Sequence, residues 1–532
     1  SWTPLTDNLP TLGVSGIAIH PNNSDIIYIG TGDANAQDSY GIGVLKSTDG
    51  GVSWNSTGLA WNLEENLRVH RLMMHPNDPE TLFAATSGGL WKTTNGGLVW
   101  YLVLTGGIRD MEFHPSNPDI IYAGRNRVFR SIDGGEEFDA VSDGLPSSSQ
   151  VGRIALAVSI DDPSVVYALL TNNSTNGLLG VYRSNDEGAS FELTTDSPNI
   201  LSGDFEGAGT GGQGWYDLAI AASPINVDNV FVGGVNLWES NDGGSSFEMN
   251  AYWVYDTPGV DYVHADVHQL EFFGNRFYCA SDGGLWRSNN YGNSFTNRSF
   301  GLEVSQCYRI GVSQLEPGKV ITGLQDNGTM LKSGNDWFHV QGGDGMQCFF
   351  HPDNENLVYC SSQYGALYRS TNGGAEFNWA AAGIDDDGAW TTPWEINPNS
   401  PGVIYAGYQN VWKTSNGGSG WQQVSNGINE TLRVIEISPV NSNVVYAASY
   451  DNIYKTTNGG NSWSEVGFPL TSQALTSLEA SPFDLNTIYA CVSGFAESQK
   501  VFKSTDGGVT WENIGEGLPN VPMNSIIEDP NL

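Results

Sequence analysis

Residues 47–54 read Ser-Thr-Asp-Gly-Gly-Val-Ser-Trp, and the phrase Ser/Thr-x-Asp/Asn-x-Gly-x-x-Trp/Phe occurs ten times along the 532-residue chain. The steps between copies are 46, 38, 53, 56, 48, 82, 44, 42 and 48 residues, which is the spacing typical of β-propeller blades. The long step spans two repeats, because residues 320–337 keep the flanking strand patterns and lose the Gly pair. The chain therefore contains eleven repeats. The acidic or amide positions of the phrase are Asp49, Asn95, Asp133, Asp186, Asp242, Asn290, Asn372, Asn416, Asn458 and Asp506.

Each repeat contains four short runs of β-branched and aromatic residues, bounded by Gly, Pro, Asn or Asp. Residues 119–124 are typical of the second run and residues 90–94 of the third. This pattern predicts an all-β fold made of four-stranded propeller blades.

The phrase itself is expected to form the turn between the third and fourth strands. There Gly supplies positive φ, the Asp or Asn side chain accepts hydrogen bonds from the turn's own amides, and the terminal aromatic packs between blades. The alternative is a cation or sugar site in every copy. Because five of the ten copies carry Asn, a hard cation would lose a charged ligand in each of them, so the pattern favours a structural role.

The phrase resembles the Asp-box, or BNR repeat, of sialidase-type, sortilin-type and tandem-propeller xyloglucanase-type proteins. The amino-acid sequence of the repeats, including the opening residues 1–5, also resembles that of large secreted repeat proteins of the Bacteroidetes type. The resemblance covers nearly the whole chain and implies a propeller fold and a secreted or cell-surface location. It leaves the function open, because this superfamily includes hydrolases, receptors and assembly factors.

The number of rings is the next question. Propeller rings usually hold four to eight blades, so eleven repeats favour two propellers in tandem. We expect a first propeller of about seven blades over residues 1–342, and blades of a second, incomplete propeller over residues 343–532. One large ring of the sortilin type is the rival. Residues 1–6 resemble a fourth strand and residues 523–530 a first strand, which predicts that the chain stops in mid-blade.

Composition excludes several classes of partner. The chain has 22 Lys and Arg against 59 Asp and Glu, a formal charge of −37, so a nucleic acid would be repelled. No apolar run approaches the length of a membrane helix, so no membrane insertion is expected. The five cysteines do not form a disulfide framework, although Cys348 and Cys360 lie on neighbouring predicted strands, where one bridge would fit. Calcium suits an acidic extracellular protein, but the sequence assigns it no site.

Departures from the repeat mark the candidate site. Four consecutive unusual segments, residues 263–268, 280–284, 324–329 and 342–345, fall where first strands begin or second strands end. In a propeller these places lie on one face, so we expect the segments to converge.

His264, Asp266 and His268 alternate within the first of these segments. If they lie on one strand, its period of two places all three side chains on one side. Two imidazoles and a carboxylate on one face suit a transition metal, and the alternative is a hydrogen-bonded polar cluster.

Acidic and amide groups beside Gly, with aromatic neighbours, suit a neutral sugar, whose hydroxyls need acceptors and whose apolar faces need rings. The aromatic candidates come from the loop over residues 252–262, which interrupts the repeat, and the alternative for them is packing between blades. The candidate ligand-binding residues are His264, Asp266, His268, Asp282, Asp326, Asn327, Asp344, Trp253 and Tyr262.

A glycoside hydrolase needs two carboxyl groups, one as acid and one as base or nucleophile. In the xyloglucanases that the chain resembles, one catalytic Asp follows the second strand of the first blade, and Asp33 holds that place here. The Gly pair that follows it in the family is replaced by residues 34–38. Asp326 is the second candidate acid, with Asp344 as its alternative. The Arg triad of sialidases is not matched: the arginines that begin strands, for which an Asp or backbone partner is expected, are Arg68, Arg109, Arg153 and Arg309.

Two functions therefore remain open. The first, which is favoured because the recognisable acids are not paired in a known catalytic pattern, is a secreted or surface propeller that binds a polysaccharide or another surface protein without catalysis. The second is a glycoside hydrolase that acts on a β-glucan or xyloglucan-like polysaccharide through paired Asp residues.

Overall fold

The computed structural model describes residues 3–11, 13–36, 39–302, 305–469 and 473–529. Within these residues the chain forms eleven antiparallel sheets of four strands in sequence order, so the predicted all-β fold of four-stranded blades is confirmed. One sheet has a fifth strand, which pairs parallel to its neighbour. The two 3-10 helices are η1 (Leu63–Glu65) and η2 (Gln363–Gly365).

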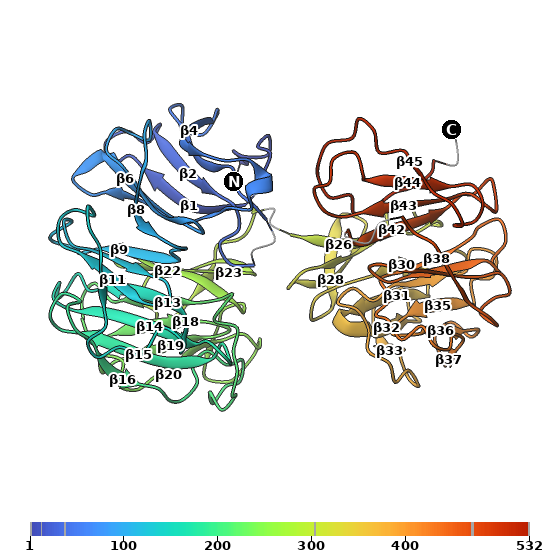
Figure 1. Ribbon diagram of the computed structural model, residues 1–532. Coiled ribbons are helices and arrows are strands. Elements are labelled where there is room, and N and C mark those ends of the chain that lie inside the picture. The colour runs from blue at the N-terminus through green and yellow to red at the C-terminus, as the bar shows by residue number, and fades with distance from the viewer. Residues whose placement is uncertain (1–2, 12, 37–38, 303–304, 470–472, 530–532) are drawn as a thin grey trace. The chain divides into compact units, whose positions relative to one another are not determined.

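The chain divides into two compact units, residues 1–303 and residues 304–532 (Figure 1). The first unit contains six sheets and the second contains five. The sheet over residues 307–341 thus groups with the second unit, although the expected boundary at 342/343 would have placed it in the first. The division into two rings of defined blade number stays a prediction.

The strands of the first unit are, sheet by sheet, β1 (Val14–Ile19), β2 (Ile27–Thr31), β3 (Gly43–Ser47), β4 (Asn55–Ala60); β5 (Val69–His75), β6 (Asp78–Thr86), β7 (Gly89–Thr93), β8 (Tyr101–Thr105); β9 (Asp110–Phe113), β10 (Ile121–Gly124), β11 (Val128–Ser131), β12 (Asp139–Val141); β13 (Val151–Val158), β14 (Val166–Asn172), β15 (Leu178–Ser184), β16 (Glu192–Thr195); β17 (Ala219–Ala222), β18 (Val230–Gly233), β19 (Leu237–Ser240), β20 (Glu248–Tyr252), β21 (Asp261–Tyr262); β22 (Val267–Phe273), β23 (Arg276–Ser281), β24 (Gly284–Ser288) and β25 (Thr296–Asn297).

The strands of the second unit are β26 (Cys307–Val312), β27 (Val320–Leu324), β28 (Gly328–Ser333), β29 (Asp336–Gln341); β30 (Cys348–Phe350), β31 (Val358–Ser362), β32 (Ala366–Ser370), β33 (Asn378–Trp379); β34 (Trp394–Ile396), β35 (Ile404–Gly407), β36 (Val411–Thr414), β37 (Gln422–Gln423); β38 (Val434–Ile437), β39 (Val445–Ala448), β40 (Ile453–Thr456), β41 (Ser464–Val466); β42 (Leu475–Ala480), β43 (Ile488–Val492), β44 (Val501–Ser504) and β45 (Glu512–Asn513). No strand covers residues 3–6 or 523–529, where edge strands were expected.

Each repeated phrase forms the predicted turn between the third and fourth strands of its sheet. In the first copy Ser47 Oγ donates to Asp49 Oδ1 at 2.8 Å and accepts from the Gly51 amide at 2.8 Å, while the Ser53 amide donates to Asp49 Oδ1 at 2.9 Å. Asn95 Oδ1 accepts the amide of Val99 at 2.9 Å in the same way. The side-chain oxygen is thus used by the turn, whether the residue is Asp or Asn.

The apolar cores lie between consecutive sheets. Tyrosines of the second strands cross these cores to the turn of the next sheet: Tyr28 OH donates to Gly96 O at 3.0 Å, and Tyr122 OH donates to Glu187 O at 2.9 Å. The terminal aromatic of the phrase reaches the other way, since Trp463 Nε1 donates to Val424 O at 3.0 Å in the preceding sheet. The turns therefore join neighbouring sheets.

Replacing Ser240 with alanine is expected to destabilise the first unit by about 1–3 kcal/mol, because the buried amide of Gly244 loses its acceptor. Ser240→Thr is the matched control, since Thr93 accepts the equivalent amide of Gly97 at 3.2 Å. Thermal unfolding of both variants checks this expectation. Equal melting temperatures for the alanine and threonine variants would contradict it.

The possible bridge between Cys348 and Cys360 is not formed, and both thiols are free. The two residues are direct partners on β30 and β31, as expected, but Cys348 Sγ points to Ile321 O, 3.4 Å away. Burial raises the pKa of the Cys348 thiol to about 12. Cys279, Cys360 and Cys491 are buried in second strands, as their small-residue positions predicted.

Glutamates on first strands link consecutive sheets of the second unit. Glu395 Oε2 on β34 accepts the amide of Ile437 on β38 at 3.1 Å, and Glu436 Oε1 on β38 accepts the amide of Ala480 on β42 at 2.9 Å. Desolvation raises the pKa of Glu395 to about 8, and the pKa of Glu436 is raised by desolvation and by the charge of Glu395. Burial thus disfavours the ionised form of both carboxyl groups.

Candidate functional site

Asp33 begins the loop between β2 and β3, two residues after β2 ends. Its Oδ1 accepts the amides of Asn35 at 2.7 Å and Ala36 at 3.2 Å, so the carboxylate fixes its own turn. Within the described part of the chain, no hydrogen bond reaches its other oxygen, Oδ2. The side chain is half-buried. Oδ1 of Asp33 thus orders the loop.

Two arginines from other sheets hold this loop. The Arg109 guanidinium, just before β9, donates through Nη1 to the carbonyl of Ala34. Arg153 on β13 donates through Nη2 to Asn35 Oδ1 at 3.0 Å. Burial and the charge of Arg109 lower the pKa of Arg153 to about 10, and burial and the charge of Arg68 lower the pKa of Arg109. Asp33 supplies a compensating negative charge beside Arg109.

Arg153 also reaches the segment that precedes β17. Its Nη1 donates to the carbonyls of Tyr216 at 3.0 Å and Trp215 at 3.3 Å. The backbone partners expected for the arginines that begin strands are thus confirmed for Arg109 and Arg153, and also for Arg309, which donates to Tyr308 O at 2.8 Å.

Tyr216 connects this bridge to two of the predicted ligand-binding residues. Its hydroxyl donates to Asp282 Oδ2 at 2.7 Å, while His268 Nε2 lies 2.8 Å from Asp282 Oδ1. The rings of Tyr216 and His268 meet edge to face, with 4.7 Å between their centroids. The network from Asn35 through Arg153 and Tyr216 to Asp282 therefore joins four sheets of the first unit.

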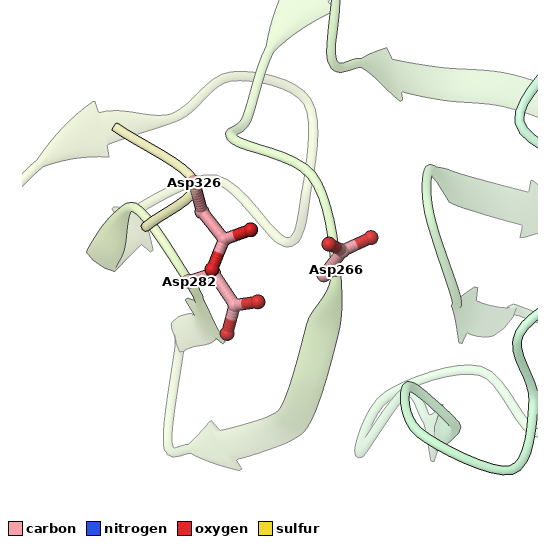
Figure 2. A group of neighbouring side chains, drawn as sticks. All are labelled: Asp266, Asp282 and Asp326. Atoms are coloured by element: carbon pink, nitrogen blue, oxygen red, sulfur yellow. The ribbon is translucent and has the colours of Figure 1, made fainter. Parts of the chain in front are cut away.

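Asp266 and Asp282 lie on neighbouring loops of the first unit, ahead of β22 and after β23 (Figure 2). Gln213 Nε2 donates to Asp266 Oδ1 at 2.5 Å and to Asp217 Oδ2 at 3.3 Å. Asp217, which no sequence pattern marks, is buried close to Asp266. Burial raises the pKa of Asp217 well above its usual value, and burial and the charge of Asp282 raise that of Asp266.

The predicted alternation of His264, Asp266 and His268 on one strand is wrong. Strand β22 begins only at Val267, and Asp266 has a φ of +65°, which turns the chain before the strand starts. The His264 ring packs instead over the turn at Gly283, where a β-carbon would lie 2.2 Å from the ring.

The metal-binding prediction loses the strand geometry on which it rested. Among the described residues, neither unit taken alone brings ligand atoms of three His, Cys, Asp or Glu residues within 4.8 Å of one another. Hydrogen bonding already accounts for Asp266 and His268.

The aromatic side chains of the loop over residues 252–262 differ in their surroundings. Tyr262 lies in β21 and packs edge to face against Trp286, with centroids 5.3 Å apart, so it is a packing residue. Trp253 and Tyr255 are 44% and 72% exposed. Trp253 Nε1 donates to Gly203 O at 3.1 Å, which fixes the ring at the surface. An exposed, fixed ring suits contact with the apolar face of a sugar.

In the second unit, Asp326 follows β27 and has a φ of +56°. Its amide donates to Oδ1 of Asp344 at 2.9 Å, and the Asp344 amide donates to Oε1 of Gln363 at 3.1 Å. The two predicted residues Asp326 and Asp344 are thus neighbours. Asp344 is buried and positions the Asp326 turn, while Asp326 is half-buried. Asn327, next in the chain, donates through Nδ2 to Gln325 O at 3.0 Å.

Three aromatic side chains form a chain of contacts that reaches Gln325, the residue before Asp326. Tyr308 OH donates to Gln325 Oε1 at 3.0 Å and accepts from Trp390 Nε1 at 3.0 Å. Tyr364, 64% exposed and with a φ of +59°, meets Trp390 edge to face at 5.2 Å. A bulky residue at positive φ is strained, and such strain is characteristic of functional sites.

Comparisons with known proteins connect this architecture to two groups. A family model described as Sortilin, neurotensin receptor 3 (Sortilin-Vps10) matches residues 409–525. A xyloglucanase of a Paenibacillus species is 35% identical over 112 residues, 19% of this chain and 11% of that protein. A xyloglucanase of Hypocrea jecorina is 30% identical over 111 residues, 18% of this chain and 13% of that protein. The resemblance to these propellers is confirmed. The matches span only 11–13% of the length of these curated relatives.

Solved structures extend the likeness to nearly the whole chain. The GH74 enzyme of Niastella koreensis aligns with a TM-score of 0.57 at 20% identity, over 94% of this chain and 78% of that one. The GH74 xyloglucanase of Xanthomonas campestris aligns with a TM-score of 0.59 at 16% identity, over 96% of this chain and 87% of that one. At these identities the likeness establishes the fold. No helix among the described residues is long and apolar enough to cross a membrane.

Proposed function

We propose that the protein is a glycoside hydrolase that acts on a β-glucan or xyloglucan-like polysaccharide outside the cell or at its surface. Asp33 is the proposed catalytic carboxylate of the first unit, and Asp326 is the candidate in the second. The observation that carries the proposal is the Asp33 loop: one carboxylate oxygen is fixed by two amides, and two arginines from other sheets hold the loop in place. The similarity to xyloglucanases supports the same class of substrate.

In such a reaction a water molecule adds across the glycosidic C–O bond. The anomeric carbon gains a hydroxyl group, and the leaving oxygen gains a proton from the catalytic acid. We assign Asp33 the part of base or nucleophile, because two backbone amides donate to its Oδ1 and fix the carboxylate in place. Asp326, in the second unit, is the other predicted catalytic carboxylate. The buried Asp217 is only 1% exposed and is inaccessible to a polymer, so we give it no catalytic part.

A panel of polysaccharides tests the proposal. We expect reducing ends to appear with xyloglucan or another β-glucan, and Asp326→Asn to lower the rate by about 100-fold or more, as loss of a catalytic carboxyl group does. Asp139→Asn, which changes an exposed carboxylate of β12, should keep the wild-type rate. If none of the substrates gains reducing ends, the hydrolase proposal fails.

The second candidate is a propeller that binds glycan without cleaving it. The exposed rings of Trp253 and Tyr255 favour this function, because they suit sugar contact without catalysis. Retention of polysaccharide by the wild-type protein, with no release of reducing ends, would support it.

A further inference from the structure

We propose that Arg153 is the positioning residue of the Asp33 site: its guanidinium fixes the Asp33 turn to the Tyr216–Asp282 network, so that the two form one rigid surface. This inference rests on the proposed function for its kinetic test, but its structural test is independent of activity.

The first step of the argument is the shape of the contact. One guanidinium makes three hydrogen bonds in two directions: Nη2 donates to Asn35 Oδ1 at 3.0 Å, and Nη1 donates to the carbonyls of Trp215 and Tyr216 at 3.3 and 3.0 Å. Asn35 is 118 residues from Arg153 in the chain, and Tyr216 is 63 residues away. Only a planar fork of donors spans such a pair of partners, and lysine, a point charge, does not.

The second step is the position of each partner. The Asn35 amide donates to Asp33 Oδ1 at 2.7 Å, so a shift of Asn35 moves the carboxylate directly. The Tyr216 hydroxyl donates to Asp282 Oδ2 at 2.7 Å, so the other arm of the bridge ends on a second carboxylate. The guanidinium therefore sets the separation between the Asp33 turn and the Asp282 turn.

The third step is the cost of placing a cation there. Arg153 is half-buried, and the nearby charge of Arg109 opposes its own. A partly buried cation beside a second cation is destabilising, and the negative charges that offset it include those of Asp110 and Asp217. Packing alone would be satisfied by an apolar side chain of similar length, so the contacts of the guanidinium account for the residue.

Hydrogen–deuterium exchange tests the bridge without any substrate. In Arg153→Ala we expect faster exchange of the amides of Asn35 and Ala36, and of the segment at residues 214–217, than in the wild type. Arg127→Ala is the matched control, because Arg127 is an exposed arginine of the same unit whose guanidinium donates to Ser148 Oγ at 3.2 Å. Unchanged exchange at both segments overturns the inference.

Asn35→Ala covers the case in which Arg153→Ala does not fold. It removes the Nη2 contact and leaves the guanidinium with its two carbonyl acceptors. Exchange at residues 33–36 should rise while the melting temperature stays near that of the wild type. Slow, wild-type exchange at these residues in a folded Asn35→Ala protein overturns the inference as well.

The effect of a variant on kcat, compared with its effect on KM, distinguishes a positioning role from a merely structural one. On a polysaccharide that the wild type cleaves, Arg153→Lys should lower kcat by about 10- to 100-fold, with KM changed far less, because a displaced carboxylate affects the transition state more than binding. Suppose that kcat of Arg153→Lys falls only together with its melting temperature, and that Arg127→Lys changes neither. The loss of activity then comes from loss of stability, which contradicts a positioning role. If the wild type cleaves nothing, the proposed function fails, while the exchange experiment still decides the bridge.

Discussion

Replacing Asp33 with asparagine is expected to lower the rate of reducing-end release about 1000-fold, while the melting temperature stays at the wild-type value. The amide oxygen of asparagine can still accept the amides of Asn35 and Ala36, so the turn keeps its shape. The variant loses the negative charge that the proposed base or nucleophile needs, and such losses commonly reach this size. Initial rates on the best polysaccharide substrate, with unfolding curves of the same samples, check both halves of the expectation.

Asp139→Asn is the control for this variant as well, since it removes one negative charge from an exposed strand of the same unit. A rate for Asp33→Asn within a factor of two or three of the wild type would remove Asp33 from the chemistry. A rate loss accompanied by a large drop in melting temperature would instead assign Asp33 to the turn alone.

The second large effect concerns stability and pH. Glu395→Gln is expected to stabilise the second unit by about 1–3 kcal/mol near pH 8 and to change little near pH 4.5. In the folded protein Glu395 has a raised pKa of about 8, and in the unfolded chain its pKa is near the ordinary 4.5. Between these values the folded state holds a proton that the unfolded state has lost, so wild-type stability falls as pH rises through this window and levels off above it. Glutamine removes this dependence and keeps an oxygen for the Ile437 amide.

Thermal unfolding at pH 5, 7 and 8.5 measures this difference, with Glu512→Gln, an exposed glutamate of β45, as the control. The gap between Glu395→Gln and the wild type should widen with pH, and the Glu512→Gln curve should follow the wild type throughout. A gap that stays constant or narrows with rising pH would show that Glu395 is ionised in the folded protein.

Much of the fold is predictable from the sequence because the repeated phrase is a local device. The hydrogen bonds that join Ser47 to Asp49 and to Gly51 lie within five residues of the chain. The residue types that repeat in the sequence are therefore the ones that form the turn. The repeat over β26–β29 lacks the Gly pair and still forms four strands, because its strand pattern is kept.

The candidate site is less predictable, because its contacts join distant segments. The strand expected through Asp266 fails at one positive φ, and a period-two pattern carries no signal for such a turn. The charge of Asp266 acts on Asp217, which is 49 residues away in the chain. Arg153 donates to the carbonyl of Tyr216, which is 63 residues away. The one available signal was an arginine at the start of a strand, for which a backbone partner was expected.

Mass spectrometry of xyloglucan incubated with the wild-type protein is the most direct test of the proposed activity. We predict a series of soluble oligosaccharides that increases with time and is absent from the Asp33→Asn incubation. A polymer of unchanged length, bound to the protein but not cleaved, would contradict the hydrolase account and leave a glycan-binding propeller in its place.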